Sequence, residues 1–155
     1  TGLIVIRSGL MTAGQYAVVL DPEYAGQYSI PGGAITVAVS NTNLGNGLTT
    51  TDPIRLYEPD GASLIDSFSH PFDPGNGTSV EKVDIAGGDI ITNWKASSCG
   101  SSPGAVNCSA GQLQPAATGL IISEVMANPA NPSRCLYEIA CPHHHIQPFL
   151  HHHAP

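Results

Sequence analysis

Short apolar runs that end at glycine, proline or a polar residue recur along the chain, and long amphipathic helical patterns are scarce. Residues 2–7, 15–20 and 34–39 are three such runs near the N-terminus. In the third run the alternate positions from Ile35 to Val39 are apolar, and alternate side chains of a strand point to the same face. We therefore expect three strands here, with the Ile35 face turned toward a hydrophobic core.

The strongest hairpin signal lies between residues 54–58 and 62–68, which flank the tripeptide Pro-Asp-Gly at 59–61. Proline presets the φ angle of a turn and glycine tolerates a positive φ, so this tripeptide favours a tight reversal of the chain. The second arm allows two registers, because either Ile65 or its apolar neighbours on the other face can point inward. We expect Ile65 to point inward beside a β-bulge.

The second half of the chain contains two more strand candidates. Residues 78–84 form one, and residues 119–126 form the more apolar one, which stops at Asn128-Pro129. Between them lies the only tryptophan, Trp94. We expect it to seal one end of the fold, because burying so large a side chain contributes roughly a few kcal/mol. Residues 99–115 are rich in serine, glycine and proline, which predicts a loop followed by a linker.

Composition supports a single all-β domain. A chain of 155 residues is long enough for one β-sandwich of ordinary size but too short for two complete ones. Only 11% of the residues are charged, whereas 17 are glycine and 13 are proline. This mixture is typical of many short strands joined by tight turns.

The charge balance argues against nucleic acid and membranes as partners. Five lysines and arginines against twelve aspartates and glutamates give a formal net charge of −7. Such a chain repels both the phosphate backbone of nucleic acid and anionic lipids. No apolar run approaches the roughly 20 residues that cross a bilayer. We therefore expect neither nucleic-acid binding nor membrane insertion.

Six segments of turn and strand residues follow one another in an order that is found in a known family. They are residues 13–19, 44–48, 52–61, 79–84, 93–94 and 99–104. Together, over about residues 10–108, they resemble the bacterial form of the lamin tail domain family. The resemblance implies an all-β, immunoglobulin-like antiparallel β-sandwich. It also implies a non-catalytic accessory or adhesion module of a secreted or cell-surface protein, with protein or cell-surface partners.

The order of the chain ends departs from the family pattern. Residues 120–129 resemble the opening strand of the family, yet here they follow its closing segment. We favour a window across two tandem modules; the alternatives are a circular permutation and a strand that completes a neighbouring subunit and builds a fibre. On this basis residues 1–108 form the sandwich and 109–118 a linker. Residues 119–134 then contain the displaced opening strand, and 135–155 form an irregular tail rich in cysteine and histidine.

The cysteines point to an oxidising compartment. Four cysteines, an even number, and a low lysine content suit an exported protein with disulfides. The family resemblance implies a disulfide between Cys99 and Cys108, and the alternative is a pair of free thiols. Cys135 and Cys141 are candidates for a second pair. Because the chain begins at Thr1 without an initiator methionine, we expect it to be a piece of a longer protein.

Six of the seven histidines form two clusters near the end of the chain. These candidate metal ligands are His143, His144, His145, His151, His152 and His153. Neutral imidazoles bind zinc and copper, so a metal-binding protein is one alternative function. The spacing matches neither a zinc finger nor a haem attachment motif. The other interpretations are a low-complexity tail, an added affinity tag, or translation in a shifted reading frame.

The sequence contains no catalytic motif that we recognise, so we expect neither an enzyme nor a cofactor. A Gly-x-Ser-x-Gly nucleophile motif is absent, and His70 is expected to be a polar loop residue rather than a general base. Acidic turns such as residues 73–76 have the composition of ordinary turns and lack the spaced aspartates of a calcium loop. Asn76 and Asn107 each begin a glycosylation sequon.

Overall fold

The computed structural model describes residues 3–6, 11–20, 26, 28–39, 48–110, 119–127, 136–141 and 150–153. For residues 3–6, 38, 136, 137, 141 and 150–153, the description covers the backbone alone. The strands are β1 (Leu3–Ile6), β2 (Gln15–Leu20), β3 (Ile35–Ala38), β4 (Ile54–Tyr57), β5 (Leu64–Phe68), β6 (Val80–Lys82), β7 (Trp94–Ala96), β8 (Ile121–Met126), β9 (Leu136–Cys141) and β10 (Leu150–His153). A short 3-10 helix, η2 (Ile91–Asn93), precedes β7. Within the described ranges, no helix is long and apolar enough to cross a membrane.

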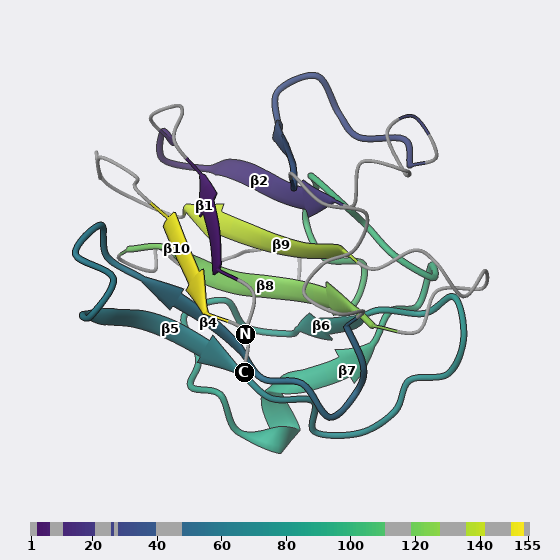
Figure 1. The fold of residues 1–155 in the computed structure, drawn as a ribbon. Helices are drawn as coiled ribbons and strands as arrows, with labels where there is room; N and C mark the ends of the chain where they lie inside the picture. The colour runs from purple at the N-terminus through teal and green to yellow at the C-terminus, as the bar shows by residue number, and fades with distance from the viewer. Residues whose placement is uncertain are drawn as a thin grey trace.

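The strands form two facing sheets, which confirms the expected all-β sandwich (Figure 1). One sheet has the order β1-β10-β4-β5, and the other has the order β3-β2-β9-β8-β6-β7. The expectation of a wholly antiparallel fold needs one correction, because β2 and β3 are parallel. The chain between Leu20 and Ile35 is long enough for the crossover that a parallel pair requires.

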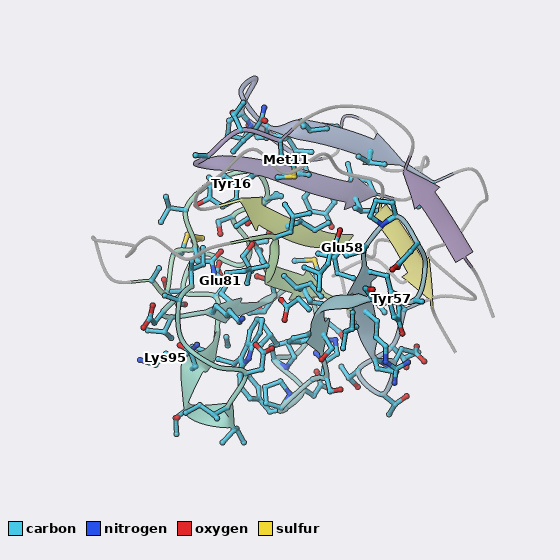
Figure 2. The ribbon with its side chains drawn as sticks, turned by 90° about the vertical axis from the view of Figure 1, so that its left-hand side faces the viewer. Met11, Tyr16, Tyr57, Glu58, Glu81 and Lys95 are labelled. Atoms are coloured by element: carbon cyan, nitrogen blue, oxygen red, sulfur yellow. A yellow bond between two sulfur atoms is a disulfide. The ribbon has the colours of Figure 1, made fainter. Side chains whose placement is uncertain are left out.

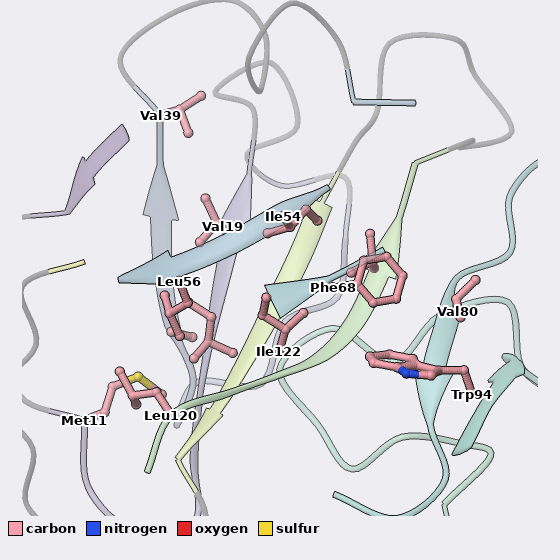
Figure 3. Close-up of a cluster of buried hydrophobic side chains, with 13 residues drawn as sticks. Met11, Val19, Val39, Ile54, Leu56, Phe68, Val80, Trp94, Leu120 and Ile122 are labelled. Atoms are coloured by element: carbon pink, nitrogen blue, oxygen red, sulfur yellow. The ribbon is translucent and has the colours of Figure 1, made fainter. Parts of the chain in front are cut away.

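The hydrophobic core fills the space between the two sheets (Figure 3). Ile54, Leu56 and Phe68 from the four-stranded sheet belong to the same buried cluster as Val19 and Ile122 from the six-stranded sheet. Burying each side chain of this kind contributes about 1.5–3 kcal/mol. As expected, the tryptophan closes one end of the core: Trp94 is 4% exposed, and its ring packs edge-on against Phe68 with centroids 4.6 Å apart.

The predicted hairpin is confirmed as β4 and β5, and the predicted bulge lies at Ile65. Leu56 is opposite Asp66 while Tyr57 is opposite Leu64, which leaves Ile65 without a partner across the pair. Ile65 packs against the core cluster, as predicted. The bulge therefore lets both Ile65 and the buried Phe68 reach the core from a single short strand.

The displaced strand, β8, lies inside the six-stranded sheet of its own chain, between β6 and β9. Val125 is opposite Val80 of β6, and Ile122 is opposite Ile139 of β9. β8 therefore pairs on both sides with strands of its own chain. The expected irregular tail instead contributes strands β9 and β10. In β9, Ile139 alternates with polar and small residues and enters the core.

Loops cover the outer face of the six-stranded sheet. Val18, Leu20 and Met126 on this face pack against Tyr28 and Ile30. The loop of residues 97–110 lies beside that segment, since a Cβ at Gly104 would be 2.9 Å from the Cβ of Ala34 and 3.0 Å from Ile30. Gly104 also has a positive φ of 80°, which other residues rarely adopt. The sheet is thus buried on both faces, and this covered outer face contains an unusual polar cluster.

Candidate functional site

Three glutamates lie side by side on adjacent strands of the covered outer face. Glu81 of β6 is opposite Glu124 of β8, which in turn is opposite Glu138 of β9. All three side chains are fully buried. We call Glu81, Glu124 and Glu138 the glutamate row. Lys95 lies opposite Glu81 on the other side of β6, but it is exposed at the margin of the molecule (Figure 2).

A β-bulge in β8 aligns the glutamate row. The pairs Ile122–Ile139 and Glu124–Glu138 follow each other directly, so Ser123 is an extra residue in β8. Because of this extra residue, Ile122 and Val125 both belong to the core cluster while Glu124 points to the opposite face. The Ser123 hydroxyl donates a hydrogen bond of 2.7 Å to the Glu138 carboxyl group.

The loop of residues 97–110 supplies the main hydrogen-bond donors to the row. Its backbone N–H groups donate to Glu124 from Ser102 (2.9 Å), to Glu81 from Ser109 (2.8 Å) and to Glu138 from Gly104. Hydrogen bonds of this kind replace the water that buried carboxyl groups lose. The loop thereby acts as a clasp over the sheet, and we call it the clasp loop.

The clasp loop is fastened by a disulfide and by an asparagine. Cys99 and Cys108 are joined, as the family resemblance implied, with their Cα atoms 6.2 Å apart. The Asn107 side chain donates from Nδ2 to the backbone oxygens of Lys82 (2.8 Å) and Ser123 (2.9 Å). It therefore ties the loop to both β6 and β8. The Glu81 carboxylate lies within 4.8 Å of both sulfur atoms, but disulfide sulfurs cannot act as thiolate ligands for a metal.

Protons must be shared within the glutamate row. The Ser102 hydroxyl is 2.8 Å from Glu81 and 3.0 Å from Glu124, yet it has a single proton to donate. Both contacts are hydrogen bonds only if one carboxyl group is itself protonated. Burial raises the pKa of Glu124, and burial together with the charge of Glu124 raises the pKa of Glu138 to about 8. At neutral pH the row is therefore partly protonated and serves to hold the clasp loop.

A separate cleft of about 430 Å³ opens between the two sheets. We call it the Asp66 cleft; it is lined by residues of β5, β6 and β8, by Leu120, and by the loop of residues 85–89. Asp66 accepts a hydrogen bond of 2.8 Å from the N–H of Ile122, which links the two sheets. Lys82 forms an ion pair of 2.8 Å with Asp89, and its ammonium lies 5.4 Å from the centre of the Trp94 ring. Burial raises the pKa of Asp66.

Asn93 fixes the loop of residues 84–93 beside the Asp66 cleft. Its side chain donates to the backbone oxygens of Asp84 (2.9 Å) and Gly88 (3.0 Å) and accepts from the N–H of Asp84 (2.9 Å). A Cβ at Gly87 would be only 2.7 Å from Asn93 Nδ2, so a side chain there would displace the asparagine. The same loop exposes 64% of Ile90 and 63% of Ile91. We call residues 84–93 the isoleucine loop.

His70, which the sequence led us to expect as a polar loop residue, packs against Phe68 with ring centroids 4.7 Å apart. Its ring nitrogens are buried and have no hydrogen-bond partner within the described part of the chain. Burial lowers the pKa of His70 to about 4, so the ring is neutral at pH 7. These contacts are those of a packing residue.

The other predicted site residues are described only in part. His143, His144, His145 and Cys135 lie outside the described residues. Cys141 lies on β9, and His151, His152 and His153 lie on β10, where their backbones pair with β1 and, at His151 and His152, with β4. The sequence analysis did not identify the glutamate row or the Asp66 cleft. The available signal was a glutamate inside each of two largely apolar strands, at Glu124 and Glu138.

Comparisons of the chain with protein-family models, with curated proteins and with solved structures found no match. The resemblance to the lamin tail domain family therefore stays a prediction from the sequence.

Proposed function

We propose that the chain is a non-catalytic binding module of an exported protein, and that the isoleucine loop contacts a protein partner. The observation that carries this proposal is the exposure of two neighbouring isoleucines, Ile90 and Ile91, on a loop that Asn93 holds rigid. Exposed large apolar side chains in a fixed arrangement are typical of protein-binding surfaces. A rigid loop also loses little conformational freedom when a partner binds.

Two further features support this proposal. The Cys99–Cys108 disulfide favours an oxidising compartment, and therefore export. The carboxyl groups of the glutamate row are closed in by the clasp loop and accept its hydrogen bonds, which suits a structural role rather than a reaction with a substrate. Accessory and adhesion modules need a stable scaffold that presents a surface loop.

A random-peptide display library tests the proposal although the partner is unidentified. The library is selected against the immobilised chain, against the double variant Ile90→Asp and Ile91→Asp, and against Val106→Asp as control. Val106 is 54% exposed on the clasp loop, so its substitution replaces an exposed apolar side chain by a negative charge elsewhere. We expect peptides with a shared apolar motif to be enriched by the unchanged chain and the control only. Equal enrichment by all three proteins would reject the isoleucine loop as the binding surface.

The fibre-subunit alternative requires β8 to leave its own sheet and enter that of a neighbour. In the structure β8 already has a partner strand on each side, so a single chain completes the sheet. Light scattering over a wide concentration range separates these cases. We expect a constant monomer mass, and mass growth with concentration would favour the fibre.

The metal-binding alternative concerns the histidine-rich end of the chain. Isothermal titration with zinc, comparing the unchanged chain with one in which all six candidate histidines are alanine, tests it directly. Tight binding that disappears in the variant would establish a metal-binding tail.

A further inference from the structure

The Asp66 cleft is lined by apolar side chains and by three charged ones, Asp66, Lys82 and Asp89. Ile65, Ile85, Leu120 and Ile121 line it, and they come from both sheets and from the isoleucine loop. The volume of about 430 Å³ lies in the range of small-molecule and side-chain pockets. The apolar side chains in this lining suit the methylene groups of a long side chain, and the charged ones suit a polar group at its end.

The charged groups that line the cleft are two carboxyl groups, Asp66 and Asp89, and one ammonium group, Lys82. Lys82 and Asp89 form an ion pair with an N–O distance of 2.8 Å, so they neutralise each other. Among the described residues Asp66 has no ion-pair partner within 4.0 Å. Its carboxylate accepts hydrogen bonds from the N–H groups of Ile122 and Ser67. A carboxylate offers about four acceptor positions, so Asp66 has capacity for further donors.

We propose that the Asp66 cleft binds an arginine side chain of the protein partner, with the guanidinium group beside Asp66. This inference rests on the proposed function and deepens it, because Asp89 lines the cleft and the exposed Ile90 and Ile91 follow it directly in the chain. A guanidinium group is planar, remains charged, and is more weakly hydrated than an ammonium group, so it suits a partly buried carboxylate better than lysine does. The formal net charge of −7 also attracts a basic partner.

The expected recognition motif is therefore an arginine flanked by apolar residues. The arginine would enter the Asp66 cleft, and the flanking apolar side chains would contact Ile90 and Ile91.

The test uses nuclear magnetic resonance of the labelled full chain with three peptides. They are acetyl-Leu-Arg-Leu-amide, the same peptide with citrulline in place of arginine, and the same peptide with glutamate. Citrulline has nearly the shape of arginine without its charge. We expect saturable shifts of the Gly87, Gly88 and Ile121 amide signals with the arginine peptide, and at least tenfold weaker binding of the citrulline peptide.

The variant Asp66→Asn keeps an oxygen for the Ile122 N–H and removes the charge. We expect it to bind the arginine peptide at least tenfold more weakly, whereas Asp73→Asn, the same change on an exposed loop that does not line the cleft, should leave binding unchanged. Near-ultraviolet circular dichroism of Trp94 checks that both variants are folded. If Asp66→Asn fails to fold, the arginine and citrulline peptides on the unchanged chain still decide the question.

Three results would overturn the arginine proposal. They are the absence of saturable shifts at these amides, equal affinity for arginine and citrulline, and preferential binding of the glutamate peptide. Each result leaves the proposed function standing if the display library still selects peptides that need Ile90 and Ile91. Loss of that selection would instead reject the proposed function itself.

Discussion

At the scale of single residues, the hydroxyl of Ser102 determines how the glutamate row can be protonated. It contacts Glu81 and Glu124 at hydrogen-bond distance but has one proton for the two of them. A buried carboxylic acid in this position donates a hydrogen bond as well as accepting one. Hydrogen bonds of neutral carboxyl groups therefore help to hold the row in place, and its contribution to the free energy of unfolding depends on pH.

The substitution Glu138→Gln tests this dependence. The pKa of Glu138 in the folded chain is about 8, compared with an ordinary value of 4.5. A raised pKa contributes stability that is complete below the unfolded value and is lost as pH rises through the folded value. Glutamine stays neutral and keeps an oxygen for the Gly104 N–H. We expect the variant to lose less stability than the unchanged chain between pH 5 and pH 9.

Urea unfolding at a series of pH values measures this difference. Glu58→Gln, on the β4–β5 hairpin, is the matched control and should reproduce the pH profile of the unchanged chain. Parallel profiles for all three proteins would show that Glu138 is ionised in the folded state at neutral pH. Other groups face Glu138 as well: Glu124 and Glu81 raise its pKa, while hydrogen bonds from Ser123 and Gly104 lower it.

Two neighbouring glycines of the isoleucine loop test whether the Asn93 side chain fixes this loop. A Cβ at Gly87 would be 2.7 Å from Asn93 Nδ2, whereas a Cβ at Gly88 would meet nothing within 4 Å. We expect Gly87→Ala to lower the free energy of unfolding by about 1–3 kcal/mol, as overpacking does. Gly88→Ala should change it far less. Thermal unfolding of the two variants makes the comparison, and equal losses would contradict the proposed role of Asn93.

At the scale of the elements, local sequence patterns predicted where the strands lie better than which strands pair with each other. The alternation of Ile54 and Leu56, the Pro-Asp-Gly turn and the bulge at Ile65 all depend on residues close in sequence, and the structure confirms them. The parallel β2–β3 pair could not be predicted this way, because it depends on strands separated by a long connection. Pairing across such distances is decided by complementary surfaces rather than by local pattern.

The glutamate row could not be predicted either, because it too depends on residues that are far apart in the sequence. Each glutamate has an apolar neighbour in its strand, Val80, Val125 or Ile139, which is compatible with a strand that has one exposed face. The clasp loop that covers this face is far from β9 in sequence, and its donors are mostly backbone N–H groups that no side-chain motif reveals. A disulfide between Cys99 and Cys108 was implied by family resemblance, but its position over the row was not.

Removing the disulfide should loosen the clasp loop as an element. A closed loop with a sequence separation of 9 contributes about 2–3 kcal/mol in the chain-entropy model. We expect the double variant Cys99→Ala and Cys108→Ala to lose more than this, because the released loop also withdraws its hydrogen bonds from three buried carboxyl groups. Urea unfolding measures the loss, and a value at or below the entropic estimate would show that the loop stays in place without its disulfide.

At the scale of the whole molecule, strands from the last part of the chain lie between strands from the first part. Strands β8 and β9 separate β2 from β6 in one sheet, and β10 separates β1 from β4 in the other. The core also depends on them, since Leu120, Ile122, Val125 and Ile139 all belong to the central cluster. The two sheets are therefore built from both ends of the sequence.

Truncation after Gln114 tests this dependence. It removes β8, β9 and β10, so we expect the shortened chain to lose cooperative unfolding and the near-ultraviolet signal of Trp94. The full chain should show both. A folded, monomeric truncated protein would mean that residues 1–114 form a complete domain and that β8 belongs to another module.

The amide of Asn107 has a consequence for the biosynthesis of the chain in a host that attaches sugars to asparagine. The nitrogen that a glycan would occupy is buried and donates to the backbones of Lys82 and Ser123. Sugar at this sequon would therefore prevent the clasp loop from docking, whereas Asn76 is exposed and tolerates it. Glycosylation and folding compete for the same nitrogen, so only chains that fold before the transferase reaches Asn107 become mature protein.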